Sequence, residues 1–175
     1  MDGDSNSLHD AGSRVMIRRR EACTVFDRGA FVTIRRAPFD AAQVAELRRA
    51  IESVASEHPR TVTVLVLRLA AEFPIGEQHL NDFPEFTKFM RAVDDHVVAH
   101  AIVLEFGGIR AAAMRVIGRT VMQLVRPRGA IAFFERLTEA AMWLLPYARA
   151  AGATDDLSAY VRGYRHADRL LESER

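Results

Sequence analysis

Residues 61–69 read TVTVLVLRL, and this run decides the fold class. It is almost continuously apolar and rich in β-branched side chains, which is typical of a central strand covered on both faces of a parallel sheet. A helix is predicted just before it, with Asp40 as N-cap, Gln43 completing a capping-box spacing and Pro59 preventing further extension. The apolar residues of that helix recur at helical spacing and comprise Val44, Leu47, Ile51 and Val54.

Two short β-prone runs, 22–26 and 30–34, precede this helix and are separated by a turn that contains Gly29. Because glycine adopts a positive φ without strain, we expect a tight antiparallel hairpin that adds a strand at the edge of the sheet. Residues 1–14 are small and polar, so we expect a disordered tail. The arginines at 18–20 form a basic cluster before the first strand, too short to predict binding to nucleic acid or lipid.

Strands and helices also alternate after residues 61–69. The expected elements are, in order, a helix that begins near Pro84, a strand at 101–106, a helix at 109–125, a strand at 130–134 and a helix that Thr138 caps. Such alternation implies right-handed crossovers and a mostly parallel sheet. We therefore predict one α/β domain over residues 15–150, in the order β-β-α-β-α-β-α-β-α.

Two further helices have apolar stripes, and such a stripe is the side of a helix that is expected to be buried. The stripe of the helix at 109–125 is very regular and comprises Ile109, Ala113, Val116, Ile117, Thr120, Val121 and Leu124. An extra helix is predicted over 153–174, capped by Thr154, and its stripe comprises Leu157, Tyr160, Val161, Tyr164, Ala167 and Leu171. This second stripe packs either on the same domain or on a partner, and the second alternative predicts a homodimer through the C-terminal helix.

The chain has 175 residues, a formal net charge of +1 and 49% hydrophobic residues, values typical of one globular domain. This charge balance predicts no general attraction to nucleic acid. Cys23 is the only cysteine, so no intrachain disulfide can form. No run approaches the roughly 18 apolar residues of a membrane-spanning helix, and the polar start MDGDSNSLHD is unlike a signal peptide. We expect a cytoplasmic protein with no integral membrane segment.

Two C-terminal stretches carry a family resemblance, AIVLEFGGIRAAAMRVIG at 101–118 and GAIAFFERLTEAAMWL at 129–144. Together with the order of elements from Cys23 to Leu145, they resemble the SpoIIAA-like family, also described as STAS/SEC14-like. The resemblance implies a mostly non-enzymatic domain whose bacterial members bind partner proteins and are switched by phosphorylation of a serine after the central strand. Residues 68–76 here read RLAAEFPIG, without serine or threonine, so no phosphorylation site is carried over.

The loop at 70–83 leaves the carboxyl end of the central strand, where open α/β sheets bind ligands. A connection this long is often functional, and a packed surface loop is the alternative. Its candidate ligand or partner residues are Phe73, Glu77, Gln78, His79, Asn81 and Phe83. The SEC14-like relatives imply an apolar small molecule or lipid between sheet and helices, near Phe73, Phe83, Phe86 and Phe89.

Arg68 and Glu105 are charges at the ends of two otherwise apolar strands. If these strands are neighbours, the two side chains can meet, either as a structural ion pair or as the floor of a polar site. Together with His79 they define an enzyme hypothesis. No Ser-His-Asp, Cys-His or G-x-S-x-G arrangement supports a catalytic site, however.

The polar side of the helix at 109–125 is a candidate interface. Its residues are Arg115, Arg119, Met122 and Arg126. Arginine and methionine are enriched in protein interfaces, and a solvated helix face is the alternative.

Two further patterns are incomplete. His96 and His100 have the four-residue spacing of helical metal ligands, but no third ligand can be identified. Gly107 and Gly108 lie between a strand and a helix, as anion-binding glycines do, but without a complete phosphate-binding motif. We therefore predict neither a metal nor a cofactor.

The leading hypothesis is a non-enzymatic STAS-like regulatory or adaptor domain that binds a protein partner. The alternative is a SEC14-like carrier of a small apolar ligand or lipid. A third hypothesis is an enzyme with a polar site after the central strand.

Overall fold

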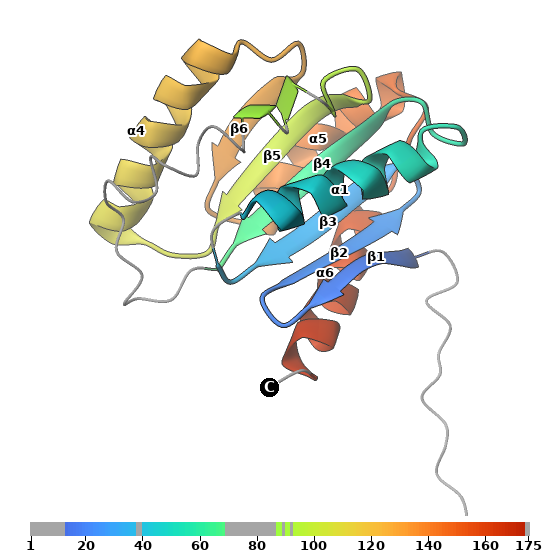
Figure 1. The fold of residues 1–175 in the computed structure, drawn as a ribbon, viewed down its shortest axis with the longest axis horizontal. Coiled ribbons are helices and arrows are strands. Elements are labelled where there is room, and N and C mark those ends of the chain that lie inside the picture. The colour runs from blue at the N-terminus through green and yellow to red at the C-terminus, as the bar shows by residue number, and fades with distance from the viewer. Residues whose placement is uncertain (1–12, 38–39, 69–86, 89, 92, 174–175) are drawn as a thin grey trace, which may run out of the picture.

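The computed structural model describes residues 13–37, 40–68, 87–88, 90–91 and 93–173. These residues form one six-stranded sheet whose strands lie side by side in the order of the chain (Figure 1). The strands are β1 (Ser13–Arg19), β2 (Ala22–Asp27), β3 (Ala30–Arg35), β4 (Thr61–Leu67), β5 (Val97–Leu104) and β6 (Ala130–Phe134). Pairs β1/β2 and β2/β3 are antiparallel, and the pairs from β3 to β6 are parallel. The predicted α/β class is confirmed.

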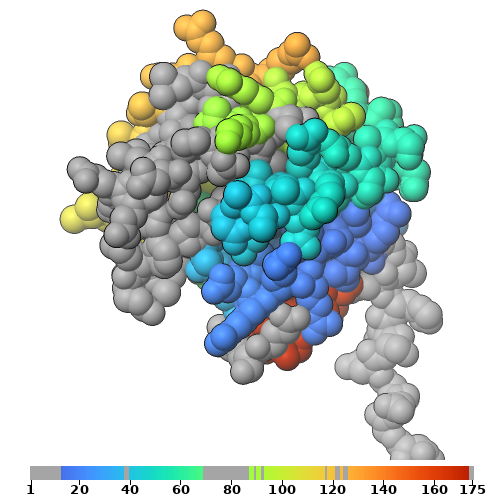
Figure 2. Space-filling view, in the orientation of Figure 1, coloured from blue at the N-terminus to red at the C-terminus, as the bar shows by residue number. Residues whose placement is uncertain are grey.

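Helices cover both faces of the sheet. They are α1 (Ala41–Val54), α4 (Gly108–Val125), α5 (Leu137–Ala150) and α6 (Leu157–Glu172). Phe31 packs with α1, whereas the next residue, Val32, packs with α5 and α6 on the opposite face. Figure 1 shows α1 in front of the sheet and α5 and α6 behind it, and in Figure 2 α1 lies on the surface of the near face, alongside the first strands.

The predicted hairpin is present as β2 and β3. Arg28 and Gly29 form its two-residue turn, with φ values of 49° and 84°. A turn with two positive φ values has the twist that matches a hairpin, and glycine takes such a value without strain. A Cβ at Gly29 would also lie 2.6 Å from the Cβ of Ala153, so the turn leaves little room for a side chain.

The sequence-based order is wrong at the N-terminal end, because β1 precedes the hairpin and takes the edge of the sheet. Ser13 and Arg14, expected in a tail, begin β1, and the basic cluster at 18–20 starts inside this strand. Ile17 is buried, whereas Val15 is exposed, and the register with β2 shifts between these two residues. This irregularity interrupts the simple alternation that identifies a strand.

Helix caps agree with the prediction in one case and differ in two. Asp40 caps α1, since its Oδ1 accepts a hydrogen bond from the Gln43 backbone N–H over 2.7 Å. The side chain of Gln43 accepts instead from Arg35, so it does not complete a capping box. Thr138 lies inside α5, whose N-cap is Arg136. Thr154 lies before the N-cap of α6, which is Asp156.

The C-terminal helix packs within the same chain. The buried residues of α6 are Ala159, Tyr160, Gly163, Ala167 and Leu171. Of these, Tyr160, Ala167 and Leu171 belong to the core formed by the central strands and α5. A Cβ at Gly163 would meet a methyl group of Val32 at 3.0 Å, which shows how closely the helix approaches β3. The apolar face that suggested a homodimer is therefore covered by the chain's own sheet.

Candidate functional site

A polar cluster lies where β4 and β5 end. The Arg68 guanidinium donates from Nε to Glu105 over 2.7 Å, from Nη1 to Asp168 over 2.6 Å and from Nη2 to the Tyr164 hydroxyl over 2.6 Å. The Tyr164 hydroxyl in turn donates to the second oxygen of Glu105 over 2.7 Å. The structure thus brings the predicted pair Arg68 and Glu105 together and adds two residues of α6.

The electrostatics of this cluster favour the charged arginine and the neutral tyrosine. Burial alone would lower the pKa of Arg68, but its hydrogen bonds to Asp168 and Glu105 outweigh burial and raise that pKa. Burial, with the hydrogen bond to Glu105, raises the pKa of Tyr164 to about 12. Because every nitrogen group of the guanidinium already has a partner, the arrangement holds α6 against the sheet rather than presenting a free cation to a ligand.

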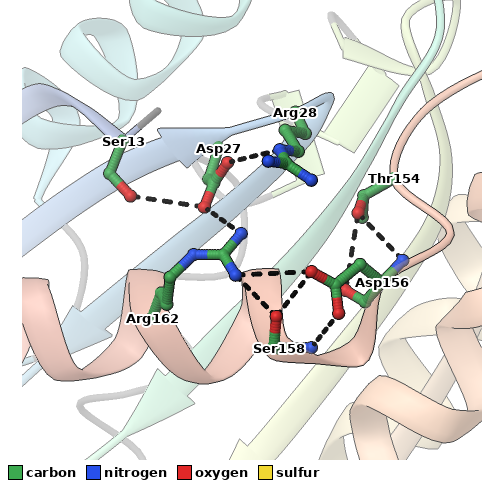
Figure 3. Close-up of polar contacts among 7 residues, drawn as sticks. All are labelled: Ser13, Asp27, Arg28, Thr154, Asp156, Ser158 and Arg162. Carbon is green, nitrogen blue, oxygen red and sulfur yellow. Dashed lines mark hydrogen bonds and ion pairs between the residues drawn. The ribbon is translucent and has the colours of Figure 1, made fainter. Parts of the chain in front are cut away.

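A second polar cluster holds the beginning of α6 (Figure 3). Asp27, at the end of β2, is only 1% exposed, and its Oδ2 accepts hydrogen bonds from Arg162 over 3.2 Å and from Ser13 over 3.3 Å. Arg162 also donates to Asp156 over 3.3 Å and to Ser158 over 2.5 Å. Asp156 is the N-cap of α6 and Ser158 lies in its first turn, so this network connects the start of the helix to β1 and β2.

His100 is buried on β5, and its Nδ1 lies 2.8 Å from the hydroxyl of Thr63 on β4. Burial lowers the pKa of His100 to about 4, so the ring is neutral near pH 7. His96 lies in the turn before β5, not on a helix with His100, so the predicted helical ligand spacing is wrong. Within the part of the chain that the structure describes, no three His, Cys, Asp or Glu residues form a group that could hold a metal ion.

An open hollow of about 290 Å³ lies at the amino ends of β5 and β6. The residues that line it are Arg60, Asp94, Asp95, Val97, Val98, Arg128 and Gly129. Asp94 accepts hydrogen bonds from the backbone N–H groups of Arg128, over 2.8 Å, and Gly129, over 3.3 Å. Its carboxylate therefore fixes the connection into β6, and Arg128 pairs with Asp95 over 2.5 Å.

Several candidate residues fall outside the described residues. The six loop candidates are among them, namely Phe73, Glu77, Gln78, His79, Asn81 and Phe83, as are Phe86 and Phe89. The ligand-loop, apolar-carrier and His79 hypotheses therefore stay predictions.

Part of the apolar stripe predicted for α4 is exposed, and the side chains of Ile117, Val121 and Leu124 lie outside the described part of the chain. Ile109 is 89% exposed and Val116 is 63% exposed, while Ala111 is buried against β5 residues. Gly118 explains this orientation, because a Cβ at this position would lie 2.3 Å from a ring carbon of Phe133 on β6. Ala111, Met114 and Gly118 thus face the sheet, and Ile109 and Val116 stay outside.

The arginines predicted as an interface have different environments. Arg115 donates to the Ala111 carbonyl over 3.2 Å and to Glu135 over 2.8 Å. Arg119 and Arg126 are exposed, and the side chain of Met122 lies outside the described residues. Gly108 begins α4 with a φ of 69°, and the guanidinium carbon of Arg110 lies 5.5 Å from the ring centre of Phe106.

None of the helices in the described ranges is long and apolar enough to cross a membrane. A comparison of the chain with models of known protein families, and with curated protein sequences, finds no match.

Proposed function

We propose that this chain is a non-enzymatic STAS-like adaptor domain that binds a partner protein through the outer face of α4. The observation that carries the proposal is the exposure of Ile109 (89%) and Val116 (63%) on a single helix face. Ala112, also exposed, lies between them at helical spacing, so the three form one apolar strip. An ordered apolar strip on a surface helix is typical of a protein interaction site.

Elementary energetics support this assignment. Burial of one large aliphatic side chain is worth about 1.5–3 kcal/mol, so a helix that leaves Ile109 and Val116 in water forgoes a substantial stabilisation. The close approach of Gly118 to Phe133 shows that the exposed orientation follows from packing on the inner side. A partner surface would supply the burial that the sheet does not.

The charges on α4 indicate the chemistry of the partner. Residues 108–125 contain three arginines, Arg110, Arg115 and Arg119, and no acidic residue. Arg119 is exposed close to the apolar strip. A partner segment with an apolar face flanked by Asp or Glu would complement both features, since complementary charge favours association and orientation.

Site-specific photo-crosslinking tests this proposal. A photoreactive phenylalanine derivative placed at position 116 should crosslink one defined protein in a lysate of the source cells, whereas the same group at exposed position 49 of α1 should not. The crosslinked segment should contain apolar residues flanked by acids, and a synthetic peptide of it should bind the purified domain. Replacement of Ile109 and Val116 by aspartate should weaken that binding at least tenfold while leaving the circular dichroism spectrum unchanged. Equal crosslinking at both positions, or unchanged peptide affinity, would rule the proposal out.

A further inference from the structure

The two edges of the sheet differ in a way that indicates a second interaction surface. An unpaired edge strand can template pairing with another chain, and proteins usually block it with charges, bulges or proline. The β1 edge is blocked, since it carries Arg14, Arg18 and Arg19 and its register shifts after Val15. The shift gives the strand the irregularity of a bulge, which discourages pairing.

The β6 edge has none of these features. Its sequence, AIAFF, contains no charge and no proline, and all five residues are partly exposed. Among the described strands, β6 pairs with β5 on one side only. A neutral, β-prone edge that no described strand pairs with is the kind of edge that accepts another strand.

Aromatic side chains flank this edge on the face that α5 covers. The Phe134 ring centre lies 5.5 Å from that of Trp143, which in turn lies 4.9 Å from Tyr147. All three rings are partly exposed, and Met142, the residue before Trp143, is 58% exposed. Aromatic residues and methionine are enriched at protein interfaces, so the surface beside the edge suits a protein partner as well as the strand does.

We infer that β6 pairs antiparallel with β6 of a second copy of this chain, joining two sheets into one across a twofold axis at Ala132. In that register Ala130 lies opposite Phe134 of the second copy and Ile131 lies opposite Phe133. Small Ala130 therefore faces large Phe134 on one side of the strand pair, Ile131 and Phe133 make an apolar pair on the other, and no charge is opposed within residues 130–134. Such self-complementarity is what an isologous twofold interface requires.

The strand pair alone is smaller than the roughly 1,600 Å² of a standard interface, so the flanking aromatic row must contribute. The small Ala130 of the second copy leaves room beside Phe134 and Trp143. The dimer differs from the one expected through α6, whose apolar face is already buried. The dimer can be tested separately from the docking surface proposed on α4, because its detection needs only the purified protein and no partner.

Sedimentation equilibrium on the purified full chain tests the inference. The wild type should show a mass of twice 19.6 kDa. Ala132→Lys should be monomeric with an unchanged circular dichroism spectrum, since it sets two like charges against each other at the axis. Val15→Lys, the matched change on the opposite edge, should stay dimeric.

Cysteine crosslinking fixes the register. Under mild oxidation Ala132→Cys should form a disulfide-linked dimer, because residue 132 faces its own copy at the axis, and Ala130→Cys should not. A monomeric wild type up to a few hundred micromolar would overturn the inference. So would an Ala132→Lys variant that stays dimeric, or a dimer in which Ala132→Cys fails to crosslink.

Discussion

Arg162, in the second turn of α6, donates a hydrogen bond over 3.2 Å to the buried carboxylate of Asp27 at the end of β2. This contact joins the C-terminal helix to the opening hairpin (Figure 3). The cluster around Arg68 does the same for the later turns of α6, where Tyr164 and Asp168 reach the ends of β4 and β5. Polar networks thus hold both halves of a helix whose apolar side covers the sheet core.

Arg162→Met should lower the free energy of unfolding by about 2 kcal/mol, because it leaves a buried carboxylate with the Ser13 hydroxyl as its main remaining donor. The double variant Asp27→Asn/Arg162→Met should recover part of that loss, since it removes a buried charge whose remaining cation, Arg28, lies 3.9 Å away. Urea unfolding followed by circular dichroism measures both. Arg165→Met, an exposed change on the same helix, is the control and should have little effect. Equal losses for the single and double variants would contradict the role given to the Asp27 charge.

Tyr164→Phe should lower the free energy of unfolding by about 1 kcal/mol, the usual value of a hydrogen-bonded hydroxyl. Arg68→Met should lower it more, by about 2 kcal/mol, because Glu105 and Asp168 both lose their cation. The cluster is partly exposed, so 1 M salt should reduce the Arg68 effect but not the Tyr164 effect. Hydrogen exchange should show faster opening of α6 in both variants. If α6 exchanges at the wild-type rate in both, the cluster does not hold the helix.

Parts of this structure follow from local sequence signals. The hairpin turn depends on Gly29 and the start of α1 on Asp40, and each acts on residues within a few positions. The meeting of Arg68 and Glu105 is also predictable, because parallel strands in register end together: Glu105 N–H donates to the Leu67 carbonyl over 3.0 Å. Residues that follow adjacent strands therefore become neighbours.

Other parts depend on packing between distant segments. Asp168 lies a hundred positions beyond Arg68, and its approach depends on where α6 crosses the sheet. Periodicity identifies α4 as a helix but does not say which side faces inward, since that side is selected by the fit of Gly118 against Phe133. The strand β1 is missed because arginines and a register shift hide the alternation of Val15 and Ile17.

Acid should destabilise the protein through His100. Burial lowers its pKa to about 4 in the folded state, below the value of about 6.5 in an unfolded chain. The unfolded state therefore binds the proton more readily, and stability falls as pH drops from about 6.5 towards 4, by roughly 1 kcal/mol per pH unit. The negative charge of Asp94 acts in the opposite direction and raises the pKa of His100, but the effect of burial is larger.

Replacement of His100 by glutamine tests this assignment. Glutamine is uncharged at every pH and can still form a hydrogen bond with Thr63. The variant should lose stability at pH 7 through imperfect packing, yet its stability should change less than that of the wild type between pH 6.5 and 4. The measurement is the urea midpoint of each protein across that pH range. Parallel pH profiles for the two proteins would exclude His100 as the acid-sensitive group.

The orientation of α4 can be tested at its closest contact with the sheet. Alanine is favoured over glycine in a helix by about 1 kcal/mol, so Gly118→Ala would stabilise a solvent-facing position. At this position, however, the new Cβ would lie 2.3 Å from one ring carbon of Phe133 and 2.8 Å from a second. Overpacking of this kind costs about 1–3 kcal/mol, so we expect a net loss of roughly 1 kcal/mol.

Phe133→Leu removes the ring that Gly118→Ala would displace. The double variant should therefore be more stable than the sum of the two single changes predicts, and a double-mutant cycle of urea unfolding energies measures that coupling. A Gly118→Ala variant that gains the full helix-propensity stabilisation, with no coupling to Phe133, would mean that α4 does not pack on β6 through Gly118. Ile109 and Val116 would then no longer be held outward by that contact, and the docking surface proposed on α4 would lose its structural basis.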